Sequence, residues 1–73
     1  MGLKLTRLDL DEAKGVLDGA ISFTMTRTSE GLTASIPGWK YVFPKRHPES
    51  KQAMRSSVYE AIARYRESQR VAQ

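Results

Sequence analysis

The residues that could do chemistry gather in the stretch IPGWKYVFPKRHPES, at positions 36–50. It holds the one tryptophan and the one histidine of the chain, with aromatic and basic residues between and around them. His47 could ligate a metal or move a proton, and the aromatic residues could stack on nucleic-acid bases. The lysines and arginines could bind anions.

Metal binding and catalysis both lack the partners that His47 would need. The chain has no cysteine and no second histidine, so carboxylates at unrelated spacing would have to complete a metal site. No GxSxG elbow occurs, the glycines form neither a P-loop nor GxGxxG, and a histidine between two prolines is poorly placed as a base. We therefore expect a non-enzymatic protein with no catalytic residue, no metal and no cofactor.

Length and composition predict one globular domain over residues 1–73. With 73 residues, 40% of them hydrophobic and 27% charged, the chain can bury one small core and no second one. The absence of cysteine favours a reducing compartment, and the start lacks the apolar run of a signal peptide. We expect a cytoplasmic protein without a membrane span.

The formal net charge of +4 is unevenly distributed. Residues 1–20 hold three basic and four acidic residues, whereas the chain from Arg27 onward holds nine basic and four acidic ones. An anionic partner should therefore contact the C-terminal two thirds.

The N-terminal part of the sequence favours a short helix. Asp9 can cap it, Glu12 can complete a capping box, and Gly19 can end it, with Leu10, Ala13 and Leu17 facing inward. Before it, Leu3 and Leu5 alternate with polar residues, so residues 1–8 form either an edge strand or a flexible tail.

The next section alternates apolar and polar residues with period two, which predicts three antiparallel strands. Loops at 28–31 and 37–38 would place Met25 opposite Ala34 and Ile36 opposite Trp39. Pro-Gly favours a type II turn, whose twist suits a two-residue hairpin poorly, so we expect a bulge or a longer loop there. One face then collects nine apolar residues: Ile21, Phe23, Met25, Leu32, Ala34, Ile36, Trp39, Tyr41 and Phe43.

The C-terminal part predicts one long helix, opened by Pro48, with Glu49 in its first turn, and running to about Arg70. Met54, Val58, Ala61, Ile62 and Tyr65 form an apolar stripe at helical spacing. Packed on the nine-residue face, this stripe completes the core. The expected fold is a two-layer α+β domain, in which a three-stranded antiparallel meander lies under one long C-terminal helix and a short N-terminal helix precedes both.

The binding surfaces are expected around this core. Trp39, Tyr41 and Phe43 share the core face, which favours burial over base stacking, although Trp39 at the strand start should stay partly exposed. At 100° per residue one side of the last helix forms a basic flank of Lys51, Arg55, Tyr59, Arg66 and Arg70. This flank is either a phosphate- or acid-binding surface or an ordinary solvated face. The candidate partner-binding residues are Trp39, Lys40, Lys45, Arg46, Lys51, Arg55, Tyr59, Arg66 and Arg70.

A three-stranded meander also leaves an outer strand, 21–27 or 39–43, with unused backbone donors and acceptors. A partner peptide could add there as a further strand, unless the N-terminal segment already covers that edge.

Two resemblances follow from these features. The meander and helix over residues 20–70 resemble the arm-type DNA-binding domain of tyrosine integrases, without the glycine-rich opening strands of that family. In size, lack of cysteine, positive charge and layout the whole chain resembles small phage-encoded regulators that bind host bacterial RNA polymerase. This second resemblance implies binding to the N-terminal region of the β′ subunit, inhibition of initiation and antitermination.

Three hypotheses about function therefore remain open. The first is a monomeric transcription regulator that binds RNA polymerase. The second is a DNA-binding protein that uses its sheet and the basic helix edge, and the third is a small antitoxin-like or structural module. Among the polar residues of the sheet face only Lys40 is charged, which is little for reading a DNA groove, so we favour protein binding.

Overall fold

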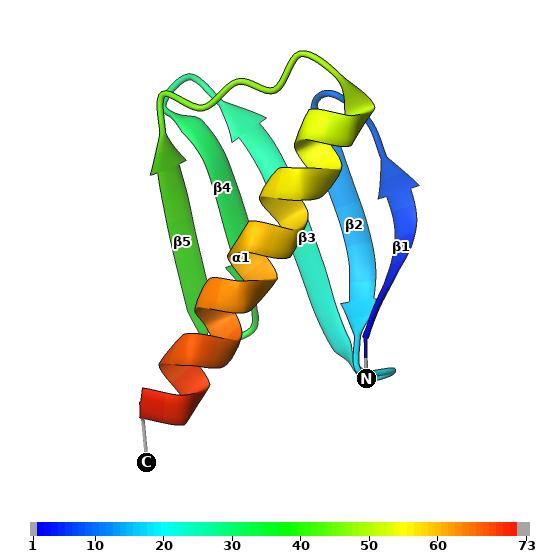
Figure 1. Ribbon diagram of the computed structural model, residues 1–73, viewed down its shortest axis with the longest axis vertical. Helices are drawn as coiled ribbons and strands as arrows, with labels where there is room; N and C mark the ends of the chain where they lie inside the picture. The colour runs from blue at the N-terminus through cyan, green and yellow to red at the C-terminus, as the bar shows by residue number, and fades with distance from the viewer. Residues whose placement is uncertain (1, 72–73) are drawn as a thin grey trace.

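The structure, a computed structural model, describes residues 2–71 as one antiparallel sheet and one helix. The elements in chain order are β1 (Leu3–Leu8), β2 (Glu12–Leu17), β3 (Ile21–Thr28), β4 (Gly31–Ile36), β5 (Trp39–Pro44) and α1 (Lys51–Val71). The strands form a meander in the order β1-β2-β3-β4-β5, and α1 crosses one face of it diagonally (Figure 1). Residues 1 and 72–73, which the predicted domain 1–73 and the predicted segment 1–8 include, lie outside the described residues.

The α+β class is confirmed, but the three-stranded meander and the N-terminal helix are wrong. The sheet has five strands, because the segment expected to be helical forms β2 and the segment before it forms the edge strand β1. Ala13 and Leu17 are buried, as a helix would also have had them, whereas Leu10 is 39% exposed. As a strand, the segment pairs with β1 on one side and with β3 on the other. A helix of only two to three turns is marginally stable by itself and would make neither pairing.

The Asp18-Gly19 pair explains the error. Asp18 and Gly19 have φ angles of 55° and 79°, and the N–H of Ala20 donates to the carbonyl of Leu17 at 3.2 Å. Two successive residues in the left-handed region make a type I′ turn, for which Asp-Gly is a preferred sequence. Gly19 therefore turns a hairpin from β2 into β3 and does not end a helix.

Gly15, which would be a defect in a helix, is required where β1 and β2 come close. A Cβ atom on Gly15 would lie 2.6 Å from the carbonyl oxygen of Lys4 and 3.2 Å from the Cα of Leu5. The β1–β2 register shifts between Leu5 and Arg7, which marks a bulge in β1.

The predicted pairing of the last three strands is confirmed. Met25 pairs with Ala34 and Ile36 pairs with Trp39, so the face expected to be apolar is continuous. The bulge expected at Pro37-Gly38 is wrong: the β4–β5 register is unbroken from Ile36 to Gly31. Gly38 has a φ of 82°, which is what the third position of a type II turn requires, and six paired positions hold the strands together despite the twist of that turn.

Ser50, and not Pro48, caps the last helix. The Oγ of Ser50 accepts a hydrogen bond from the N–H of Ala53 at 3.1 Å, and its carbonyl accepts the N–H of Met54 at 3.0 Å. Glu49 thus precedes the helix, and the expected acidic residue in the first turn is wrong. Pro48 is buried, and the Nη1 of Arg27 lies 3.5 Å from its carbonyl oxygen.

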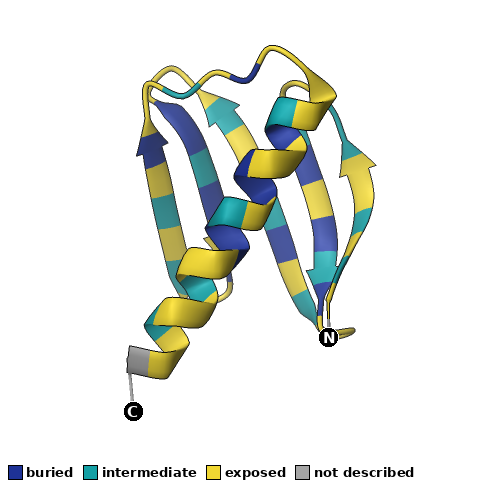
Figure 2. Ribbon diagram, viewed as in Figure 1, coloured by how far each residue is buried: buried dark blue, intermediate teal, exposed yellow. Residues whose placement is uncertain are grey.

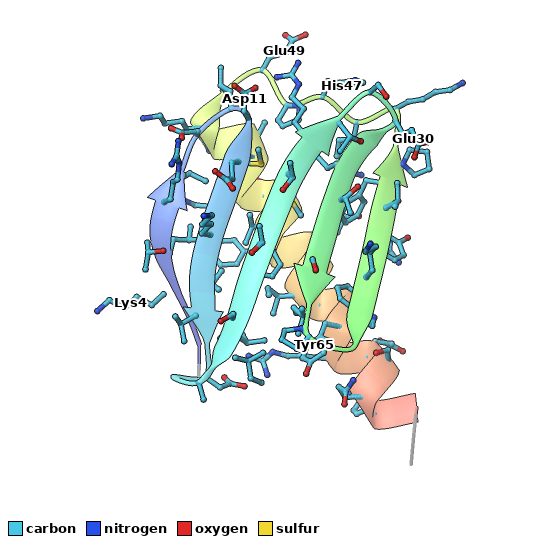
Figure 3. All side chains as sticks on the ribbon, turned by 180° about the vertical axis from the view of Figure 1, so that it is seen from behind. Lys4, Asp11, Glu30, His47, Glu49 and Tyr65 are labelled. Atoms are coloured by element: carbon cyan, nitrogen blue, oxygen red, sulfur yellow. The ribbon has the colours of Figure 1, made fainter. Side chains whose placement is uncertain are left out.

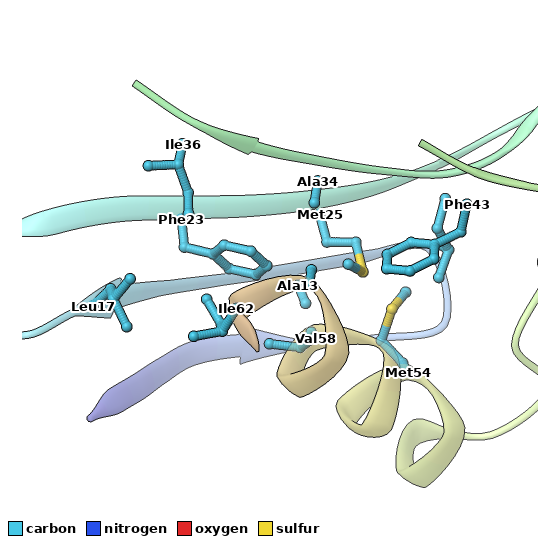
Figure 4. Close-up of a cluster of buried hydrophobic side chains, with 12 residues drawn as sticks. Ala13, Leu17, Phe23, Met25, Ala34, Ile36, Phe43, Met54, Val58 and Ile62 are labelled. Carbon is cyan, nitrogen blue, oxygen red and sulfur yellow. The ribbon is translucent and has the colours of Figure 1, made fainter. Parts of the chain in front are cut away.

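The core lies between the sheet and α1 (Figures 2 and 4). The predicted helix stripe is confirmed, with Met54, Val58, Ala61 and Ile62 buried and Tyr65 at its margin. The other face of the sheet carries the small polar side chains of β3 and β4 with Lys40 and Val42 of β5, and most of them are exposed. Within residues 2–71 no helix is both long and apolar enough to cross a membrane.

Candidate functional site

The three aromatic residues of β5 pack on each other and on the helix. The rings of Trp39 and Tyr41 are stacked with centroids 6.0 Å apart, and Tyr41 meets Phe43 edge-on at 4.9 Å. Tyr65 of α1 meets the Trp39 ring edge-on at 5.4 Å. Phe43 is buried, whereas Trp39 and Tyr41 are half-buried, so the expected partial exposure of Trp39 is confirmed.

A groove of about 700 Å³ lies beside these rings, between β5 and the C-terminal half of α1. The last turns of the helix extend beyond the end of β5 (Figures 1 and 3), so the groove is open at the edge of the sheet. Its lining residues are Trp39, Tyr41, Glu60, Ala63, Arg64, Glu67 and Ser68.

The edge of β5 beside this groove has no strand partner among the described residues, because β5 is the last strand of the sheet. The two-residue turn makes Ile36 and Trp39 a hydrogen-bonded pair, so Trp39, Tyr41 and Phe43 direct their backbone groups to β4. Lys40 and Val42 direct their N–H and C=O groups outward. Pro44, at the next outward position, has no N–H, which sets one end of the free ladder.

The opposite edge of the sheet differs, because the bulge between Leu5 and Arg7 interrupts β1 there. Bulges of this kind protect an edge strand from pairing with another chain. The N-terminal segment pairs with β2, so it leaves the edge of β5 open, and β2 covers the edge at 21–27. The regular edge that remains is β5.

Arg46, a predicted partner-binding residue, is used within the fold. Its Nη1 donates to Oε1 of Glu60 at 2.7 Å, and its guanidinium carbon lies 4.4 Å from the centroid of the Phe43 ring. The hydrogen bond from Arg46 lowers the pKa of Glu60 below its ordinary value, and Arg64 adds to this from 3.4 Å. Arg46 thus joins the β5–α1 loop to the helix.

The predicted basic flank of α1 lies on the side of the helix that faces β1 and β2. Lys51 and Arg55 line a hollow of about 370 Å³ with Leu8 of β1. Arg66 donates to both carboxylate oxygens of Asp18, at 3.3 and 3.2 Å, and this hydrogen bonding lowers the pKa of Asp18. Tyr59 is 53% exposed.

The nine predicted site residues therefore fall into two groups. Arg70 lines a further hollow with Arg66 and Asp18, on the same flank as Lys51 and Arg55. The other group is formed by Trp39 and Lys40 on β5 and by Lys45 and Arg46 directly after it. Among residues 2–71, Lys40, Lys45, Lys51, Arg55 and Arg70 form no ion pair within 4.0 Å.

Sequence reasoning missed the helix residues that line the β5 groove. Arg64 and Ser68 lie on the flank of α1 opposite the basic flank, a placement that helical spacing alone indicates, whereas Ala63 and Glu67 lie between the two flanks and also line the hollow beside Arg66 and Arg70. What the sequence did not supply was the diagonal path of α1, which brings this flank to β5. His47 makes a 3.3 Å contact from Nε2 to the carbonyl of Thr28, and no cluster of metal-ligating side chains occurs within the described part of the chain.

Comparisons of the chain with protein-family models, with curated proteins and with solved structures found no match.

Proposed function

We propose that the protein is a non-enzymatic regulator that binds a protein partner by accepting a strand of that partner at the edge of β5. The observation that carries the proposal is the regular, unpaired edge of β5 lying directly beside the aromatic groove. An added strand would accept hydrogen bonds from the outward N–H groups of Lys40 and Val42 and would donate hydrogen bonds to their outward carbonyl groups. Its alternate side chains would enter the groove under α1, which is how strand addition combines affinity with specificity.

The proposed partner is bacterial RNA polymerase, through the N-terminal region of its β′ subunit. This part of the proposal rests on the resemblance to small phage-encoded regulators in size, charge and lack of cysteine. Binding there would inhibit initiation and promote antitermination by occupying a polymerase surface, without any chemical step.

DNA binding by sheet and basic helix edge together is less well supported. The helix packs on one face of the sheet, so the exposed polar face and the basic flank of α1 belong to different layers of the molecule (Figure 1). One straight duplex would contact one of them and not both. The fold also differs from the integrase layout, since that layout has three strands and this sheet has five.

The test uses two variants at one position. Val42→Pro removes the outward N–H of Val42, and an edge strand tolerates proline where its N–H faces solvent. Val42→Thr keeps the N–H and changes only the side chain. Each tagged protein is used to capture partners from bacterial lysate, with and without nuclease treatment. Its binding to purified RNA polymerase and to the β′ N-terminal fragment is then measured.

We expect the wild type and Val42→Thr to capture polymerase, and Val42→Pro to lose it while keeping its circular dichroism spectrum and melting behaviour. Equal capture by a folded Val42→Pro variant would rule out strand addition at β5. Loss of every partner upon nuclease treatment would favour the DNA-binding alternative.

A further inference from the structure

The groove beside β5 also indicates what kind of peptide its edge accepts; this inference rests on the proposed strand addition. Tyr41 directs its backbone to Ala34, so a residue opposite Tyr41 in an added strand would form a non-hydrogen-bonded pair. Such pairs bring their side chains closest, with Cα atoms about 4.5 Å apart. The side chain of the added residue would point into the groove, against the ring of Tyr41.

The groove is shaped for an apolar side chain at that position. Trp39 and Tyr41 lie nearly parallel, with 8° between their planes, and together they form one aromatic wall. The helix opposes this wall with the small residues Ala63 and Ser68, which leave the space unfilled. The guanidinium carbon of Arg64 lies over the ring of Tyr41, 5.1 Å from its centroid, so an added side chain has to pack beside this guanidinium or displace it.

The charges around the edge favour an acidic peptide. Lys40 and Lys45 flank the edge and form no ion pair among the described residues, and Arg64 shares Glu60 with Arg46. Of the two carboxylates that line the groove, Glu60 is paired with arginines, and Glu67 forms no ion pair within residues 2–71. The side chain of Lys40 lies on the outer face of the sheet, where a cross-strand neighbour of opposite charge would stabilise the pairing.

We infer that β5 binds an extended acidic segment of its partner, in which an aromatic or aliphatic residue faces Tyr41 and a carboxylate faces Lys40. The apolar residue fills the groove between the Trp39–Tyr41 wall and α1. Lys40 and Lys45 also select against the wrong partner, because a lysine-rich strand would meet them as like charges.

The test uses three blocked peptides of one length on the intact protein. The acidic probe is Glu-Val-Glu-Phe-Glu-Val-Glu, the basic control replaces each glutamate with lysine, and the third peptide replaces the central phenylalanine of the probe with alanine. Binding is followed by amide chemical shifts in NMR titrations. We expect the acidic probe to shift the amides of Lys40 and Val42 and the indole N–H of Trp39.

The basic control should bind at least about tenfold more weakly, and the alanine peptide about ten- to hundredfold more weakly, since it loses one buried aromatic side chain. Lys40→Glu should reverse the preference between acidic and basic peptides, and Lys14→Glu, on β2 away from this edge, should leave it unchanged. Equal binding of the acidic and basic peptides, no reversal in Lys40→Glu, or no shift with any peptide would overturn the inference.

The two proposals can fail separately. If polymerase capture is lost in Val42→Pro but the acidic probe has no advantage, strand addition stands and the acidic segment is wrong. If the acidic probe binds as expected but a folded Val42→Pro variant still captures polymerase, the proposed function is wrong.

Discussion

Arg46 and Glu60 are joined by a 2.7 Å hydrogen-bonded ion pair that ties the segment after β5 to the middle of α1. Their positions are 14 residues apart, so helical spacing does not predict the pair. It places the guanidinium of Arg46 over Phe43 and leaves Arg64 to share the same carboxylate. The pair therefore fixes one end of the groove that β5 and α1 form.

Acidification should weaken this pair. The hydrogen bond from Arg46 lowers the pKa of Glu60 in the folded state, and that from Arg66 lowers the pKa of Asp18. A carboxyl group with a lowered pKa stabilises the fold above its ordinary pKa, and this contribution is lost as the pH falls through the folded-state value. The free energy of unfolding, measured with urea, should thus decrease from about pH 5 to about pH 3.

Glu60→Gln provides the control for that pH dependence. The variant should be less stable than the wild type at pH 7, and the difference should narrow as the pH falls through the lowered folded-state pKa of Glu60, because the wild-type carboxylate then becomes neutral as well. In an Arg46→Gln background the substitution should have a smaller effect at pH 7. A wild-type–variant difference that stays constant across this pH range would show that the pair contributes nothing.

Gly15→Ala should separate β1 from β2. The added Cβ would meet the backbone of Lys4, which cannot move aside as a flexible side chain would. We expect a loss of about 2–3 kcal/mol in unfolding free energy, typical of overpacking. Gly2→Ala is the matched control, because a Cβ there meets nothing within 4 Å, and it should change stability by less than about 0.5 kcal/mol. Similar denaturation midpoints for the two variants would contradict the close approach of the strands.

Several elements were predictable from the sequence because their signals are local. The alternation of Phe23 and Met25, the apolar stripe of Met54 and Val58, and the pairing of Ile36 with Trp39 each follow from a period or a turn. The N-terminal region was mispredicted because capping signals at Asp9 and Glu12 and the hairpin signal Asp18-Gly19 compete there. The pairing of β2 with β1 on one side and with β3 on the other decides between them.

The candidate site was only partly predictable for a similar reason. Trp39 and Lys40 were identified from their residue types, and the free edge at 39–43 was one of two alternatives. Arg64 and Ser68 line the groove because of the angle at which α1 crosses the sheet, and no short-range sequence pattern encodes this angle. Helical spacing placed the residues of the basic flank on one side of α1, but it did not indicate that this side faces β1 and β2 and not β5.

The docking of α1 on the sheet should dominate stability. Met54→Ala empties a fully buried position between helix and sheet and should cost about 2–5 kcal/mol of unfolding free energy. Tyr59→Ala removes a larger side chain from the same helix, but from a position that is 53% exposed, and should cost less than about 1 kcal/mol. Equal losses in urea titrations of the two variants would contradict the packing described for α1.

Salt should distinguish the two kinds of partner. Strand addition uses uncharged backbone groups with a few surrounding charges, so affinity for polymerase should fall shallowly between 50 and 200 mM salt, by less than about tenfold. Binding to DNA would instead weaken with a slope of about 0.9 in log K per phosphate contact. The measurement is a titration of polymerase and of duplex DNA at several salt concentrations. A steep slope with polymerase would mean that charge, and not the β5 ladder, dominates the complex.

Amide hydrogen exchange at Lys40 and Val42, measured in the free protein and in its complex with RNA polymerase, tests strand addition at β5 most directly. In the free protein these outward N–H groups should exchange fast, while those of Tyr41 and Phe43, directed to β4, exchange slowly. Complex formation should slow exchange at Val42, and at Lys40, by about tenfold or more, because these groups then donate to a strand of the partner. A complex in which both amides still exchange at their free rates would contradict the account.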